Sequence, residues 1–136
     1  MTKGSCLCGA VKFEVGDNTT EIGMCHCSKC RRVSGTASNA TLMVGVDGFR
    51  WIAGENTLAK YAMDDGWGVW RCSVCGSPVP RMHPAGQAYW VPAGLLEDDP
   101  GVGVAGHIFV GSRAPWDNIT DSCAQYEEGV DGKKLR

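Results

Sequence analysis

The chain has 136 residues, of which 43% are hydrophobic and 21% charged, a composition typical of a globular protein rather than a disordered one. Its formal net charge of -2 argues against a general attraction to nucleic acid or to an anionic membrane surface. No apolar run approaches the roughly 20 residues of a membrane helix, and no signal peptide is recognisable, so we expect a cytoplasmic protein with reduced thiols.

Short strands separated by turns dominate the predicted secondary structure. Residues 10–15 alternate apolar and charged side chains, which predicts a half-buried strand, and residues 21–24 form a second short strand. One helical turn is expected at 29–34, ending at Gly35. Further strands are expected at 40–44, 49–52, 58–63, 67–71, 77–82, 87–91 and 104–110.

The length predicts one domain over residues 1–136, and the many short strands predict that it is mainly β. Asp47-Gly48 is a strong hairpin signal between two of these strands. The polar residues 129–136 are expected to form a frayed tail.

Three thiols fall within six residues in the segment 24–32, and this spacing is too crowded for a disulfide pair. Three thiolates from one turn can bind one face of a tetrahedral metal ion and leave its fourth position open, as in catalytic zinc sites. A substrate thiol in that position would be acidified and could attack a small carbonyl. These three residues are Cys25, Cys27 and Cys30.

Two further cysteine pairs supply four more thiolates, enough to saturate a second zinc ion. Such a site cannot accept a substrate and instead ties an N-terminal turn to a distant hairpin, which contributes folding free energy. The sequence around the later pair, a strand followed by C-x-x-C and glycine, is typical of a zinc knuckle. The four residues are Cys6, Cys8, Cys72 and Cys75.

Other uses of these cysteines remain open at this point. An even number of cysteines allows disulfides, and Cys27 and Cys30 could instead join Cys72 and Cys75 in a zinc ribbon or a rubredoxin-type iron site. His26 could be a fourth ligand beside the three clustered thiols.

The remaining polar residues suggest less specific roles. Three cations, Lys29, Arg31 and Arg32, flank the clustered thiols and could attract a carboxylate-bearing ligand, although a solvated turn explains them equally well. His83 and His107 are isolated, and Cys123 is expected to be a lone thiol.

Three segments together resemble the glutathione-dependent formaldehyde-activating enzyme family, which also contains centromere protein V. They are Gly4-Ser5-Cys6-Leu7-Cys8-Gly9, Cys25-His26-Cys27-Ser28-Lys29-Cys30-Arg31 and Arg71-Cys72-Ser73-Val74-Cys75-Gly76. The resemblance extends over a core of about 4–121 and includes His107-Ile108-Phe109-Val110 with Ala114-Pro115-Trp116.

The resemblance implies a β-tent fold of the Mss4-like type with two zinc ions, a structural one and a catalytic, more labile one. It implies a carbon–sulfur lyase that joins glutathione and formaldehyde as S-hydroxymethylglutathione. One alternative is a non-enzymatic zinc module that binds a protein partner. A less favoured one is an enzyme similar to methionine sulfoxide reductase, which would need Cys123 as its nucleophile.

Overall fold

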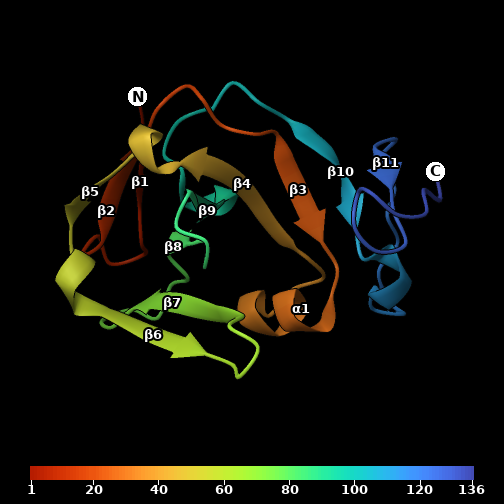
Figure 1. The fold of residues 1–136 in the computed structure, drawn as a ribbon, viewed down its shortest axis with the longest axis horizontal. Coiled ribbons are helices and arrows are strands. Elements are labelled where there is room, and N and C mark those ends of the chain that lie inside the picture. The colour runs from red at the N-terminus through yellow and green to blue at the C-terminus, as the bar shows by residue number, and fades with distance from the viewer. The chain divides into compact units, whose positions relative to one another are not determined.

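The computed structural model describes all 136 residues and contains eleven short strands, one α-helix and several single 3-10 turns (Figure 1). The predicted mainly-β character is therefore confirmed. The chain forms two compact units, unit 1 with residues 1–20 and 42–102 and unit 2 with residues 21–41 and 103–136. The single domain over 1–136 stays a prediction. The one α-helix is too short to cross a lipid bilayer.

In unit 1, a three-stranded antiparallel sheet joins β1 (Thr2–Ser5), β2 (Lys12–Val15) and β5 (Phe49–Ala53) in the order β1-β2-β5. The alternation predicted for β2 is confirmed, since Phe13 and Val15 are buried. Strand β1 was not predicted, because its glycine hides the strand pattern. That glycine, Gly4, lies against the ring of Phe13, where a Cβ atom would collide.

The hairpin predicted at Asp47-Gly48 is wrong. Strand β4 (Asn39–Gly45) is followed by a 3-10 turn over Val46–Gly48, and β5 then pairs with β2 rather than with β4. The 3-10 turn redirects the chain, and the amide of Gly16 at the end of β2 donates to the carbonyl of Gly48 at 2.8 Å. Asp47-Gly48 therefore marks a change of chain direction, but it does not identify the strand with which β5 pairs.

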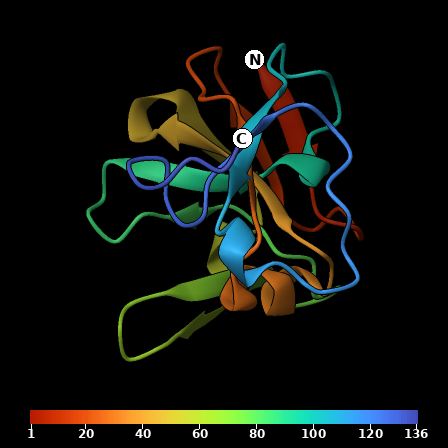
Figure 2. The ribbon, with the colours of Figure 1, turned by 90° about the vertical axis from the view of Figure 1, so that its right-hand side faces the viewer.

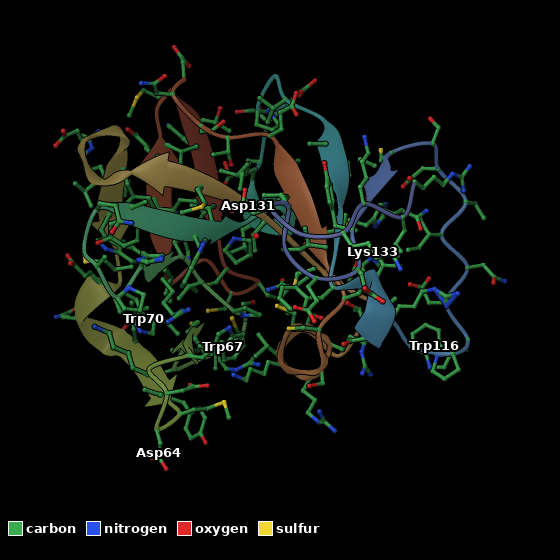
Figure 3. The ribbon with its side chains drawn as sticks, turned by 45° about the vertical axis from the view of Figure 1, so that its right-hand side comes forward. Asp64, Trp67, Trp70, Trp116, Asp131 and Lys133 are labelled. Atoms are coloured by element: carbon green, nitrogen blue, oxygen red, sulfur yellow. The ribbon has the colours of Figure 1, made fainter.

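Two hairpins complete unit 1. Strands β6 (Leu58–Ala62) and β7 (Gly68–Cys72) pair in antiparallel fashion, with Asp64 at their turn (Figure 3), and β8 (Arg81–Met82) pairs with β9 (Ala88–Pro92). After β7 the chain reverses. The amide of Cys72 donates to the carbonyl of Ser77 and that of Val79 to the carbonyl of Trp70, both at 2.9 Å. The chain thus reverses at the C-x-x-C segment as predicted, with a bridge between Arg71 and Pro78, but the strand predicted over 77–82 is limited to β8. Single 3-10 turns cover Glu55–Thr57 and Ala93–Leu95.

Unit 2 is built around β3 (Ile22–Cys25), which leads directly into the helix α1 (Ser28–Ser34). Strand β10 (Val104–Ile108) runs parallel to β3 on one side, and the first residues of β4 run antiparallel to it on the other. The short β11 (Ala124–Gln125) pairs with β10 (Figure 2), and a 3-10 turn covers Val110–Ser112.

The C-terminal tail is hydrogen-bonded to β11 and not frayed as expected. The amide of Gln125 donates to the carbonyl of Arg136 at 3.1 Å, and the amide of Leu135 donates back to Gln125 at 2.7 Å. Asp131 and Lys133 lie on the loop that reverses the chain (Figure 3). Backbone hydrogen bonds hold this polar segment in place, and such bonds cannot be predicted from a pattern of side chains.

Candidate metal centres

Unit 1 brings together the two cysteine pairs that the sequence analysis combined, here named the four-cysteine cluster (Cys6, Cys8, Cys72, Cys75). The first pair lies on the turn after β1, and the second lies at the end of β7. All four sulfur atoms lie within 4.8 Å of one another. The Sγ atoms of Cys6 and Cys8 are 3.7 Å apart, and those of Cys8 and Cys72 are 3.8 Å apart.

These separations match a tetrahedral zinc site. Zn–S bonds of about 2.3 Å give a tetrahedron whose S–S edges are about 3.8 Å long. A disulfide would need the two sulfurs about 2 Å apart, so none is formed here, and all eight cysteines are free. The four-cysteine cluster could therefore hold a metal ion, and its all-thiolate donor set is one that zinc takes in closed sites.

Backbone and hydroxyl donors surround these sulfurs. The amide of Val11 donates to Sγ of Cys6 at 3.3 Å, and the amide of Val74 donates to Sγ of Cys72 at 3.4 Å. The hydroxyl of Ser77, 3.4 Å from Sγ of Cys75, lowers the pKa of that thiol to about 5. Such donors stabilise the thiolate form, which is the form that binds metal.

Unit 2 contains the second group, here named the three-cysteine cluster (Cys25, Cys27, Cys30). Cys25 ends β3, Cys27 is the N-cap of α1, and Cys30 lies in the first turn of the helix. The N-cap thiol accepts a hydrogen bond from the amide of Cys30 at 3.3 Å, so capping the helix draws two of the sulfurs together. The three sulfurs lie within 4.8 Å of one another.

The three-cysteine cluster already favours one thiolate before metal binds. A hydrogen bond from Cys30 lowers the pKa of Cys25 to about 6, and the same bond raises the pKa of Cys30. Cys25 is therefore a thiolate near neutral pH while Cys30 keeps its proton. A metal ion would replace that proton and bind all three sulfurs, leaving one position of a tetrahedron without a ligand from the cluster.

His26 lies between Cys25 and Cys27 in the sequence, and it is buried, with only 2% of its surface exposed. Its Nε2 is 2.8 Å from Nδ1 of His107, and its Nδ1 is 3.3 Å from Oδ2 of Asp117. Nε2 of His107 is in turn 2.9 Å from a carboxylate oxygen of Asp121. Both nitrogens of His26 thus face His107 and Asp117, so its interpretation as a fourth metal ligand has no support.

Sequence reasoning missed this set of contacts. His107 looked isolated because its partner lies 81 residues away in the chain. The usable signal was a single imidazole within the apolar strand 104–110, which indicated a buried polar group in need of partners. Asp117 and Asp121 lie in a segment without regular structure, where no pattern marks them.

The three flanking cations have different surroundings. Nε of Arg31 lies 3.4 Å from the carbonyl oxygen of His26, so this side chain braces the loop that carries the three-cysteine cluster. Lys29 is half-buried on α1, and Arg32 is exposed there with Nη1 3.5 Å from the carbonyl oxygen of Ser28. Of the three cations, Arg32 is the most accessible to a carboxylate arriving from solvent.

Cys123 lies apart from both clusters, and its Sγ is 3.3 Å from the carbonyl oxygen of Val104. Burial and the neighbouring Asp121 carboxylate raise the pKa of this thiol. A nucleophilic cysteine needs the opposite shift, so this environment disfavours a reductase that attacks through Cys123.

Comparison with known proteins identifies the family. The sequence profile described as glutathione-dependent formaldehyde-activating enzyme matches residues 1–112 of this chain. The chain belongs to this family. It is also similar to a Rhodobacter sphaeroides protein of known crystal structure, with 26% identity and a TM-score of 0.60, covering 75% of this chain and 98% of that one. No curated protein matches the chain.

Proposed function

We propose that the protein is a zinc-dependent carbon–sulfur lyase that joins formaldehyde to glutathione or to a related small thiol. Family membership supports the reaction class. The observation that carries the proposal is the three-cysteine cluster, whose three sulfurs could hold a metal ion and would leave one coordination position open. In the reaction the thiol sulfur bonds to the carbonyl carbon, and the carbonyl oxygen gains the proton that the thiol loses.

Each part of the three-cysteine cluster has a definable task. Its thiolates would hold zinc, which lowers the pKa of a thiol or water in the open position. The cap of α1 orients Cys27 and Cys30 toward the same ion. The exposed Arg32, on the same helix as two of these thiols, would attract a carboxylate of a glutathione-like thiol.

The four-cysteine cluster would hold the second, structural zinc. Its donor set is complete, so it has no position for a substrate. Thiolate ligands at both centres require a reducing compartment, which supports a location in the cytoplasm.

The test is a measurement of adduct formation from glutathione and formaldehyde, followed by proton NMR against the uncatalysed reaction. We expect the zinc-loaded protein to accelerate equilibration and the Cys27→Ser variant to leave it at the background rate. A zinc-loaded wild-type protein that does not exceed background with glutathione or with other small thiols would refute the lyase proposal.

The alternative is a zinc module that binds a protein partner. Two apolar side chains favour it, since Leu7 is 87% exposed and Val74 is 72% exposed on the turns that carry the four-cysteine cluster. Partner binding in the absence of turnover, abolished by Leu7→Ser, would support the alternative.

A further inference from the structure

We propose that a chain of four side chains, with two buried histidines at its centre, positions the three-cysteine cluster for metal binding. The chain runs Asp117–His26–His107–Asp121 and is here named the histidine chain. The proposal rests on the function proposed above, because it assigns a task to residues behind the same metal centre. None of the four side chains is a metal ligand in this assignment, and all act through the loop that carries the thiols.

The backbone of His26 is held from two sides. Its amide donates to the carbonyl of Ile108 on β10 at 3.0 Å, and its own carbonyl accepts from Arg31 on α1. This residue therefore sits where β3 ends and the chain turns into the helix. A displacement of His26 would move Cys25 and Cys27 together, because they are its two chain neighbours.

The side chain of His26 is fixed through His107. Both rings are buried, with 2% and 4% of their surfaces exposed, and their centroids are 5.1 Å apart. Nε2 of His26 and Nδ1 of His107 are 2.8 Å apart, a distance that identifies a hydrogen bond between the two rings. Leaving such buried polar atoms without partners is costly, so this bond determines the direction in which His26 points.

Asp121 sets the order of donors along the histidine chain. Its carboxylate can only accept, so Nε2 of a neutral His107 carries the hydrogen and Nδ1 becomes an acceptor. Nε2 of His26 must then be the donor in the bond to His107, and Nδ1 of His26 faces Oδ2 of Asp117. These last two atoms are buried and 3.3 Å apart, within ion-pair distance.

Hydrogen bonds at both nitrogens of His107 hold the two rings in one arrangement, and such polar networks make the structure around them rigid. Cys25, His26 and Cys27 are consecutive, so an imidazole anchored to His107 on β10 restricts the backbone positions of the two flanking cysteines. Outer partners of this kind commonly change metal affinity by about 10-fold to 100-fold.

The experiment measures cobalt binding to the full-length protein by absorption spectroscopy. Cobalt reports thiolate number and geometry, and subtracting the Cys27→Ser spectrum removes the contribution of the four-cysteine cluster. The test variant is His107→Phe, and the matched control is His83→Phe. His83 is a histidine of unit 1 that packs against Trp90 and accepts from the amide of Ala85.

We expect His107→Phe to weaken cobalt binding at the three-cysteine cluster by about tenfold or more and to lower the tetrahedral band intensity there. The four-cysteine signal and the His83→Phe variant should match wild type. If His107→Phe does not fold, Asp121→Ala tests the same point from the outer end of the histidine chain. Asp121→Asn, which retains an acceptor for His107, should restore binding to within about twofold of wild type.

Unchanged cobalt affinity and spectrum in a folded His107→Phe variant would overturn the proposal, as would equal effects of Asp121→Ala and Asp121→Asn. These outcomes are separable from failure of the proposed function. If wild-type protein binds no metal at the three-cysteine cluster, the lyase proposal fails. If it binds metal and the variants bind equally well, only the positioning role fails.

Discussion

At the scale of single residues, each thiol owes its character to one or two close neighbours. Cys25 and Cys75 have lowered pKa values chiefly because of their side-chain hydrogen bonds with Cys30 and Ser77, respectively. Cys123 has a raised pKa because burial and Asp121 both disfavour its thiolate. Identical side chains in one protein therefore favour the thiolate in two places and the thiol in a third.

We expect iodoacetamide to alkylate Cys25 before Cys30 and Cys123 in the metal-free protein at pH 7. The pKa of Cys25 is lowered from 9.0 to about 6, so its reactive thiolate is lost only as the pH falls through about 6. The rate at Cys25 should rise between pH 5 and pH 7 and level off, as measured by peptide mass spectrometry. Rates at Cys30 and Cys123 should still be rising above pH 8. Equal labelling of all three at pH 7 would contradict the assignment.

At the scale of elements, the seven-residue helix α1 is too short to form by propensity and depends on its ends. Cys27 caps the first turn. Gly35 ends the helix in the left-handed conformation with φ of 66°, and its amide donates to the carbonyl of Arg31 at 2.8 Å. The helix is therefore stabilised at its start by a thiol of the three-cysteine cluster, which serves as a cap, and at its end by a glycine that permits the closing turn.

Gly35→Ala should destabilise the protein by about 1 kcal/mol, because alanine is strained in the left-handed region. No other atom lies within 4 Å of the added Cβ position, so strain is the only cost. The matched control is Gly94→Ala, at a glycine that also has open space around it and no left-handed φ. Urea unfolding curves should separate the two variants, and equal midpoints would show that the helix end is not strained.

At the scale of the whole molecule, each compact unit contains one cysteine cluster. The four-cysteine cluster joins segments 64 residues apart, whereas the three-cysteine cluster lies within one turn. Metal bound by the first therefore closes a long loop and contributes to folding, while metal bound by the second closes almost none.

Cys72→Ser should unfold the protein or sharply lower its melting temperature, because structural zinc can contribute on the order of 10 kcal/mol, comparable to the total stability of a domain. Cys27→Ser should retain one zinc per chain and melt near the wild-type temperature, since serine can replace the cysteine as an N-cap. Zinc counting and circular dichroism provide the measurements. Loss of both metals in Cys27→Ser would mean that the cysteines are shared differently.

The sequence alone was sufficient for both cysteine clusters and for the main strands. Close spacing within C-x-C and C-x-x-C limits the distance between the sulfur atoms. The alternation of apolar and charged side chains in residues 10–15 indicates directly which of them are buried. These are local properties, so a linear pattern contains them. The number of ligands that zinc needs allowed the pairing of the two distant cysteine segments, and the structure brings these two segments together.

Only the tertiary structure decided which distant segments meet. Asp47-Gly48 predicted a turn correctly but could not reveal that β5 pairs with β2. A strand can pair with any strand whose edge is free, and a local sequence does not show which edge that is. The parallel pairing of β3 with β10 brings His107 to His26 from 81 residues away, and nothing local to either histidine encodes it. Long-range hydrogen bonds depend on the whole set of packed strands, which is why the histidine chain appears only in three dimensions.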